Sequence, residues 1–232
     1  MVNENHIKGG LILKLNEKHK SYQMALRDKD MLPVIAYGSA GTSKTYSACE
    51  AAVEWLNKNN KSKVLVTRPN VSFAQGNGYL PGTEQEKMEP WVRPIRHSFK
   101  ELGMSVSHME NLEKNGRITY MPLEFIQGLT FDNTFIILDE CQNMTAEQLR
   151  VFLTRTGKWS KVVLCGDVAQ TSPKFRNSGL QDLIQMVDTY DLPVHTIEFT
   201  QEDIVRSGQC RMWIRAYEQW DNGQHPYDTP SN

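Results

Sequence analysis

The sequence predicts an α/β protein in which a mostly parallel sheet lies between layers of helices. Short apolar runs with almost no interruption recur at residues 34–37, 63–67, 134–138 and 161–165. Strands buried on both faces of a parallel sheet have this composition. Helical patterns alternate with these runs, and such alternation is typical of α/β architectures. Residues 194–199 instead alternate apolar with polar side chains, which indicates an edge strand.

Three segments have the apolar period of an amphipathic helix. The first predicts a helix over residues 45–58. The second begins at Thr145, which with Gln148 has the spacing of a capping box. The third lies near the C-terminus and is expected to bury one face. The three stripes are Ala48, Ala51, Ala52, Trp55 and Leu56; Leu149, Phe152 and Leu153; and Cys210, Trp213, Tyr217 and Trp220.

Two regions interrupt the alternation of strands and helices. Residues 69–115 contain four prolines and three glycines among their first 26 positions and show few clear strands, so we expect a long irregular, functional segment there. Residues 221–232 are polar and predict a flexible tail. The expected organisation is an N-terminal extension over 1–15, one domain over 16–220, and this tail.

Length and charge limit the possible functions. The chain has 232 residues, which at about 150 residues per domain corresponds to one large domain or two small ones. Its net charge is −1, from 26 Lys and Arg against 27 Asp and Glu. A near-neutral chain does not hold nucleic acid through its overall charge, so such a partner requires a local basic patch.

The cysteines and apolar runs predict a cytoplasmic protein without a membrane span. The four cysteines lie far apart, form no C-x-x-C pair and are expected to stay reduced. No run approaches the ~18 apolar residues of a membrane helix. The apolar cluster at residues 11–13 is too short for the core of a signal peptide.

A phosphate-binding loop is predicted between the first apolar run and the first helix. Residues 38–45 read GSAGTSKT, close to the pattern G-x-x-x-x-G-K-[ST]. Backbone N–H groups of such a loop bind phosphate oxygens, the lysine reaches the β- and γ-phosphates, and the last hydroxyl ligates Mg²⁺. Serine replaces the usual glycine at position 43, and its Cβ crowds the backbone's approach to phosphate. The simpler alternative is a glycine-rich turn. The predicted nucleotide-binding residues here are Gly38, Ser39, Ala40, Gly41, Thr42, Ser43, Lys44 and Thr45.

Two further polar segments follow buried strands. Asp139 and Glu140 end the run at 134–138; Asp139 is expected to hold Mg²⁺, and Glu140 to orient or deprotonate the attacking water. Gln170 follows the run at 161–165, where it could contact the γ-phosphate or that water. The alternative for both segments is a solvated turn at the end of a strand.

Several motifs in one order make the sequence resemble the PhoH family of P-loop ATPases, which is related in motif to superfamily 1 helicases. The resemblance covers roughly residues 16–220. The blocks that carry it are residues 38–45, Thr67-Arg68-Pro69, residues 78–82 (GYLPG), residues 135–143 (FIILDECQN), residues 152–155 (FLTR), residues 166–170 (GDVAQ), Ser178-Gly179-Leu180 and Asp203-Ile204-Val205-Arg206.

The resemblance implies a three-layer RecA-like core, hydrolysis of ATP with Mg²⁺, a ring of subunits, most simply a hexamer, and a role in RNA handling. It also implies roles for residues that spacing alone would assign to the surface. Gln23 lies where related ATPases read adenine, and Arg206 matches a late arginine of the family. Because one core lacks a second domain to supply an arginine, Arg206 is expected to act in trans on a neighbouring subunit; Arg155 is a second candidate. Many members carry RNA-binding or nuclease domains, for which this length leaves no room.

A nucleic acid is expected at a local basic patch. Arg68 and three lysines lie around the second apolar run, and a second group of cations follows at helical spacing, with Trp91 and Phe99 near enough to stack on bases. A solvated charged face is the alternative, and Trp55, Trp213 and Trp220 favour core or subunit contacts. The cations are Lys58, Lys61, Lys63 and Arg68, followed by Arg93, Arg96, His97 and Lys100.

The sequence therefore predicts a magnesium-dependent ATPase coupled to RNA or single-stranded DNA, with helicase-like remodelling as one outcome. Lys44, Glu140, Gln170 and Arg206 are its predicted catalytic residues. Two alternatives stay open: a P-loop kinase acting on a small molecule, and a non-catalytic RNA-binding module that responds to nucleotide. A ribonuclease has no support, because we find no acidic cluster apart from the ATP site.

Overall fold

A computed structural model describes residues 5–8, 11–69, 84–167 and 178–221. Within these ranges the main sheet has six strands in the order β5-β4-β6-β7-β3-β8, and every neighbouring pair is parallel. All five predicted strands are confirmed, with 194–199 as the edge strand β8 beside β3. The strands are β3 (Val34–Gly38), β4 (Lys63–Arg68), β5 (Ile118–Pro122), β6 (Thr134–Leu138), β7 (Lys161–Gly166) and β8 (His195–Phe199).

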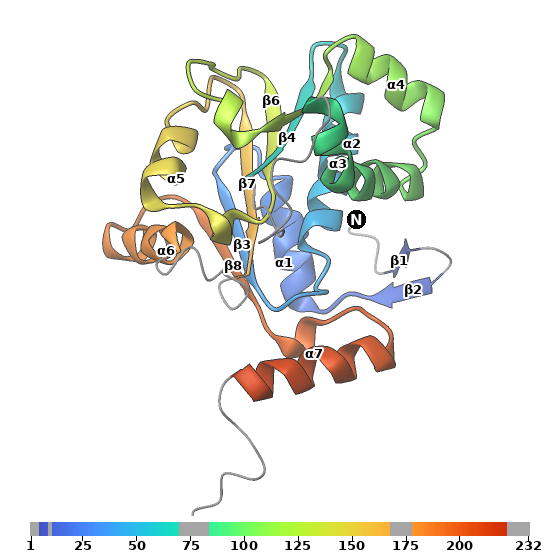
Figure 1. Ribbon diagram of the computed structural model, residues 1–232, viewed down its shortest axis with the longest axis vertical. Helices are drawn as coiled ribbons and strands as arrows, with labels where there is room; N and C mark the ends of the chain where they lie inside the picture. Colours follow the sequence, from blue (N-terminus) through green and yellow to red (C-terminus); the bar gives the residue numbers. More distant parts are fainter. Residues whose placement is uncertain (1–4, 9–10, 70–83, 168–177, 222–232) are drawn as a thin grey trace, which may run out of the picture.

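Helices cover both faces of this sheet, which gives three layers (Figure 1). On one face α1 to α4 pack against alternate strand residues such as Val34 and Ala36. On the other face α5 and α6 pack against the residues between them, such as Ile35. Successive side chains of a strand point to opposite faces, so a continuous apolar run supplies both cores. The helices are α1 (Glu17–Leu26), α2 (Lys44–Lys58), α3 (Glu84–Glu101), α4 (Val106–Lys114), α5 (Ala146–Leu153) and α6 (Gly179–Thr189).

The predicted starts of two helices, α2 and α5, are confirmed to within one residue. Helix α2 begins one residue before the predicted helix and buries the predicted stripe, including Trp55. Helix α5 begins with the predicted capping box: Thr145 accepts from Gln148 N, and the Gln148 side chain accepts from Thr145 N. The four cysteines are all free thiols, as expected.

The prediction of a long irregular segment over 69–115 is wrong for its second half. Residues 84–101 form α3 and residues 106–114 form α4, although Pro90 and Pro94 lie inside α3. A proline inside a helix costs about 3 kcal/mol because it removes a hydrogen bond and clashes with the preceding turn. Burial of Ile95 and Phe99 in the core offsets this cost.

The chain ends depart from the main body. Strands β1 (Asn5–Lys8) and β2 (Leu11–Lys14) pair with each other in a separate two-stranded sheet. Helix α7 (Gly208–Asp221) lies beyond the edge of the sheet in Figure 1. Its aromatic stripe is not part of this chain's core, because Trp213, Tyr217 and Trp220 are 55%, 65% and 57% exposed; the alternative of a subunit contact stays a prediction. An apolar period predicts a helix, but it does not say whether this chain supplies the surface that covers it.

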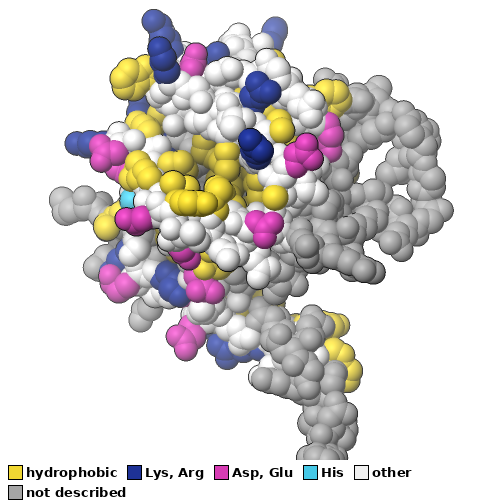
Figure 2. Space-filling model, turned by 90° about the vertical axis from the view of Figure 1, so that its left-hand side faces the viewer, with side chains coloured by type: hydrophobic (Ala, Val, Ile, Leu, Met, Phe, Trp, Pro, Cys, Tyr) yellow, Lys and Arg dark blue, Asp and Glu magenta, His cyan; other side chains and the backbone are white. Residues whose placement is uncertain are grey.

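The side of the molecule that carries α5 and α6 has a mixed surface. Figure 2 shows hydrophobic side chains gathered in its centre, with Lys, Arg, Asp and Glu interspersed around them. Charges of both signs produce no strong field of one sign for a nucleic acid. Across the described part of the chain, none of the helices has the length and apolarity that crossing a membrane requires.

Candidate functional site

The loop between β3 and α2 has the predicted strand–loop–helix context, and two glycines shape it. Gly38 has φ +107°, and a Cβ there would lie 1.9 Å from Phe199 O, so the position accepts only glycine. The next residue ties the loop to β8, because Ser39 N donates to Phe199 O at 3.0 Å. Gly41 has φ +75°, and a Cβ there would lie 2.8 Å from Arg206 Cγ. The loop is therefore held close to the residues that follow β8.

Ser43, the departure from the loop pattern, adopts the left-handed conformation, with φ 63° and ψ 23°. For a residue with a Cβ this conformation costs on the order of 1 kcal/mol, whereas glycine adopts it freely. The structure thus gives a backbone reason for the glycine usual at this position, in addition to the expected crowding of phosphate.

The Lys44 ammonium lies inside the loop. It donates to Gly38 O at 2.6 Å and to Ser39 O at 2.8 Å. Burial lowers the pKa of Lys44, while the nearby carboxylates of Asp167, Glu140 and Asp139 act in the opposite direction. A buried cation among loop carbonyls is placed to exchange them for phosphate oxygens, which are stronger acceptors.

Thr45 and Asp139 meet across the carboxyl edge of the sheet. Thr45 Oγ1 at the start of α2 donates to Asp139 Oδ1, just beyond β6, at 2.7 Å. Burial raises the pKa of Asp139, and the neighbouring Glu140 raises it further; Thr45 and Arg68 oppose this shift. A bound cation would relieve the cost of this buried charge.

This pair fits a magnesium ion. Mg²⁺ prefers oxygen ligands and is commonly bound by one or two protein groups together with water and substrate phosphates. Thr45 and Asp139 supply a hydroxyl and a carboxylate at one point of the loop, and across the described ranges no group of three or more His, Cys, Asp and Glu side chains forms a fuller cage. The donor set suits an ion that is held jointly with a nucleotide.

Glu140 is held by a residue that the sequence reasoning did not assign. Gln142 Nε2 donates to Glu140 Oε2 at 2.6 Å, and Gln142 Oε1 accepts from Asp167 N at 3.1 Å. Gln142 is 1% exposed, so both ends of its amide are committed inside the protein. Glu140 itself has a left-handed backbone, with φ 55° and ψ 35°. Strain of this kind occurs where the surrounding structure fixes a residue.

A cavity of about 370 Å³ opens between the phosphate loop, the ends of β4, β6 and β7, and one side of α3. Arg206 lines this cavity in the same chain, and Val205 N donates to Gly41 O at 3.1 Å. Arg206 therefore lies beside the phosphate loop of its own chain, and its predicted action in trans stays a prediction. The charged residues around the cavity are Lys44, Arg68, Asp139, Glu140, Asp167 and Arg206, and the hydroxyl of Thr45 lies among them.

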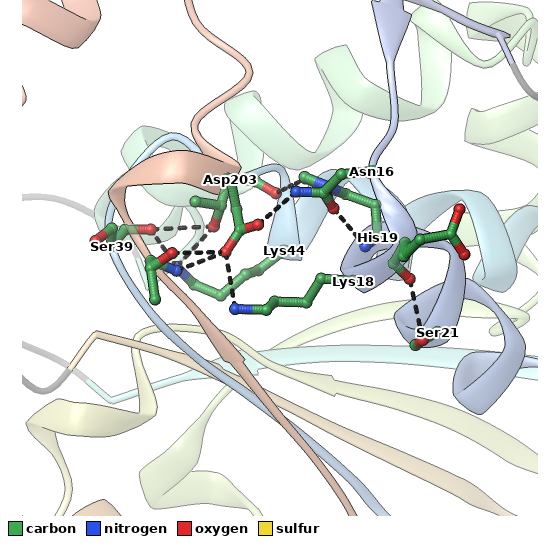
Figure 3. Close-up of polar contacts among 10 residues, drawn as sticks. Asn16, Lys18, His19, Ser21, Ser39, Lys44 and Asp203 are labelled. Atoms are coloured by element: carbon green, nitrogen blue, oxygen red, sulfur yellow. Dashed lines mark hydrogen bonds and ion pairs between the residues drawn. The ribbon is translucent and has the colours of Figure 1, made fainter.

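A second network links the start of α1 to the segment that carries Arg206 (Figure 3). Asn16 Nδ2 donates to Asp203 Oδ1 at 2.5 Å, and Lys18 Nζ lies 3.2 Å from Asp203 Oδ2. Asn16 Oδ1 lies 2.7 Å from His19 Nδ1, and His19 Nε2 lies 3.2 Å from Thr42 O in the phosphate loop. The network fixes the loop and the Arg206 segment relative to each other.

Asp203 is charged at the centre of this network. Burial raises its pKa, but hydrogen bonds from Thr200 N, Asn16 and Lys18 outweigh burial and leave the pKa lowered. Its contribution to stability is therefore present above the ordinary aspartate pKa and is lost as the pH falls through the folded value. The sequence signals for this network are Asn16, an N-cap residue ahead of a helix, and Asp203, which begins one of the family blocks.

Two further predicted residues, Gln23 and Arg155, do not line the cavity. Gln23 on α1 is buried, donates to Glu50 Oε2 at 3.4 Å, and is not among the cavity-lining residues. Arg155 O accepts from Phe131 N ahead of β6, which places Arg155 at the amino edge of the sheet, opposite the phosphate loop. Gln170 and the family block at 78–82 lie outside the described residues. The adenine and sensor roles stay predictions.

The predicted basic patch does not form as one surface. Arg68 ends β4 in the cavity, whereas Lys63 begins the strand at the opposite edge, with Lys61 just before it. Lys58 lies over the Trp55 ring, 4.4 Å from its centroid. Phe99 is fully buried and is excluded as a stacking platform for bases.

Comparisons with known proteins identify relatives over most of the chain. The family profile described as "PhoH-like protein" matches residues 11–218. A PhoH-like protein of Bacillus subtilis is 37% identical over 200 residues, covering 86% of this chain and 61% of that protein. A PhoH-like protein of Mycobacterium tuberculosis is 38% identical over 189 residues, covering 81% of this chain and 53% of that protein. This chain thus spans only about half to three fifths of these relatives.

Among solved structures, the fold is similar to that of a large terminase from a thermophilic bacteriophage, determined in complex with ADP. The TM-score is 0.56 at 15% identity, with 88% of this chain and 49% of that chain covered. At this identity the likeness concerns the fold alone. It agrees with the three-layer P-loop core predicted from the sequence.

Proposed function

This chain belongs to the PhoH-like protein family, and we propose that it is a magnesium-dependent ATPase whose hydrolysis is coupled to RNA or single-stranded DNA. Thr45 and Asp139 hold the magnesium ion, and Lys44 and the loop N–H groups bind the phosphates. The bound ion would neutralise charge on the phosphate oxygens and position them. Gln23 as the adenine contact and Gln170 as the γ-phosphate sensor belong to the same proposal.

The observation that carries the proposal is the arrangement of Thr45, Asp139 and Glu140 at one edge of the sheet. Thr45 Oγ1 and Asp139 Oδ1, the proposed metal pair, lie 2.7 Å apart, and the adjacent Glu140 is held by Gln142 beside the same cavity. A carboxylate next to the metal pair suits activation of water as the phosphate acceptor. This favours hydrolysis over transfer of phosphate to a small molecule.

The direct test is hydrolysis of radiolabelled ATP with and without Mg²⁺, in the presence of single-stranded RNA, single-stranded DNA or no polymer. We expect magnesium-dependent release of inorganic phosphate, stimulated by one of the polymers. A phosphorylated acceptor in place of inorganic phosphate would support the kinase alternative instead. Nucleotide binding without turnover would support the non-catalytic module.

Replacing Gln142 should impair hydrolysis without preventing binding of ATP. In Gln142→Leu the Glu140 carboxylate and the Asp167 N–H both lose their partner, so we expect kcat to fall ~10-fold to ~100-fold, short of the loss from removing the base itself. The measurement is kcat and KM beside the affinity for magnesium ATP. Gln148→Leu removes an amide of the same kind from the capping box of α5 and is the matched control. Equal kcat for the parent and Gln142→Leu would exclude this role.

We also propose that copies of the chain assemble, with a hexameric ring as the expected form. The exposed Trp213 and Tyr217 of α7, whose ring centroids are 6.3 Å apart, support this proposal, because large apolar side chains in this state often mark interaction surfaces. Light scattering at several concentrations, with and without nucleotide, measures the assembly. Monomers under every condition would rule it out.

A further inference from the structure

Helix α3 has two functional faces, each lining a different cavity. Trp91, Ile95 and Ser98 line the cavity of the phosphate loop. Arg93, His97 and Lys100 line a second cavity of about 540 Å³ between α3 and α4. The second set recurs at i, i+4 and i+7, which places it on one stripe of the helix. At 100° per residue this stripe lies opposite the first set.

A bidentate ion pair joins the two helices in the wall of the second cavity. Arg96 donates from Nε to Glu113 Oε1 at 2.9 Å and from Nη2 to Glu113 Oε2 at 2.6 Å. Its guanidinium carbon also lies 5.6 Å from the centroid of the Tyr120 ring on β5. A bidentate pair of this kind fixes direction as well as distance. Arg96 therefore joins α3 to α4 and β5, and its charge is already committed.

Unlike Arg96, the two permanent cations of the stripe have no ion-pair partner among the described side chains. Arg93 and Lys100 are exposed and form no ion pair with any side chain in the described ranges. His97 Nε2 lies 3.6 Å from Glu101, and Glu110 is the lining carboxylate that Arg96 does not engage. Because Arg96 and Glu113 neutralise each other, Arg93 and Lys100 are balanced only by Glu110. The lining of the second cavity therefore has an excess of positive charge.

The spacing and the lining indicate what this cavity binds. Lys100 follows Arg93 by seven positions, which is ~10 Å along the helix axis between their Cα atoms. Two exposed cations at this spacing along one helix can contact successive phosphates of a polynucleotide chain. Pro90, Val106 and Met109 supply apolar lining between α3 and α4, and Val106 is 54% exposed. Unpaired bases have apolar faces that suit such a surface.

We propose that the α3–α4 cavity binds the backbone of a single-stranded nucleic acid through Arg93 and Lys100, and that α3 transmits this binding to the ATP cavity. The inference rests on the proposed function, since it names where that function's polymer binds. A polymer held on the outer stripe biases the position of α3, which carries Trp91, Ile95 and Ser98 into the wall of the ATP cavity. Pro94 lines both cavities. Helix α3 alone therefore separates the proposed polymer site from the ATP cavity.

The test is the double variant Arg93→Glu/Lys100→Glu, compared with the parent in fluorescence anisotropy titrations on single-stranded RNA and DNA oligomers. We expect the affinity for the oligomers to be at least 10-fold weaker. We also expect the slope of log K against log salt concentration to become shallower by about one unit for each cation removed. Stimulation of ATP hydrolysis should disappear while the basal rate stays at the parent value. Neither residue lines the ATP cavity. Arg150→Glu/Lys158→Glu, two exposed cations in and after α5, is the control of equal charge.

The outcomes separate this inference from the proposed function. Parent-like polymer binding by the double variant, or equal loss in the control, would overturn the α3–α4 site. Basal ATP hydrolysis by a parent that binds neither polymer would also overturn it, while leaving the ATPase proposal intact. Competition by inorganic phosphate at the concentration of polymer phosphate would overturn it too, by showing a site for single anions. If the parent binds polymer through these residues but never hydrolyses ATP, the ATPase proposal fails and the cavity assignment stands.

Discussion

Glu140→Gln is expected to lower kcat for ATP hydrolysis by ~10²-fold to ~10⁴-fold, the range that general-base catalysis contributes. The substitution removes the charge that accepts a proton from water but keeps the shape of the side chain. A glutamine at this position also retains an oxygen to accept from Gln142 Nε2, which now lies 2.6 Å from Glu140 Oε2. The fold and the neighbouring metal pair should therefore be undisturbed.

Single-turnover hydrolysis measured beside the affinity for magnesium ATP distinguishes loss of chemistry from loss of binding. We expect binding equal to or tighter than that of the parent, because a negative charge next to the phosphates has been removed. Glu147→Gln, a matched change on the exposed start of α5, is the control. Hydrolysis by Glu140→Gln at the parent rate would assign the water-activating role to another group.

Arg206→Ala is expected to lower kcat by ~10³-fold, within the range of arginines that stabilise phosphoryl transfer. The structure places Arg206 beside Gly41 in the loop of its own chain, and Val205 N donates to Gly41 O. A guanidinium at this place is expected to meet the phosphates of a nucleotide bound to the same subunit. Arg206→Lys should recover only part of the rate, because an ammonium lacks the planar fork that binds two phosphate oxygens.

Mixing two inactive variants separates action within a subunit from action between subunits. Lys44→Ala has no functional phosphate loop but keeps Arg206. If Arg206 acts in its own chain, a mixture of Lys44→Ala and Arg206→Ala stays inactive at every ratio. Recovery of hydrolysis in the mixture would show that Arg206 works in trans, as the sequence alone had suggested.

The strand–loop–helix context of the phosphate loop and the meeting of Thr45 with Asp139 could be predicted, and the reason is local. Lys44 and Thr45 follow a strand and begin a helix, and Asp139 and Glu140 follow another strand. Parallel strands align their carboxyl ends, so residues 94 positions apart meet at 2.7 Å without further information. The contact between Thr45 and Asp139 is therefore a consequence of strand direction.

The parts that could not be predicted depend on long-range packing. In sequence, Gln142 is one more polar residue after a strand. Its role depends on β7, which brings Asp167 N to its side-chain oxygen. The link from Asn16 to Asp203 spans 187 positions and has no sequence pattern of its own. Helix α3 was not predicted because Pro90 and Pro94 are residues typical of loops. The helix is stabilised by burial of Phe99, which depends on the whole core.

The sequence by itself determined the α/β class, the strands of the sheet and the edge at which phosphate would bind, because these follow from hydrophobic period and short motifs. The tertiary structure decided which charges are available. It placed Arg206 over its own phosphate loop, committed Arg96 to Glu113, and left Arg93 and Lys100 without ion pairs among the described residues. The physical reason is that the electrostatic interaction between two charged groups depends on the distance between them, and folding sets that distance.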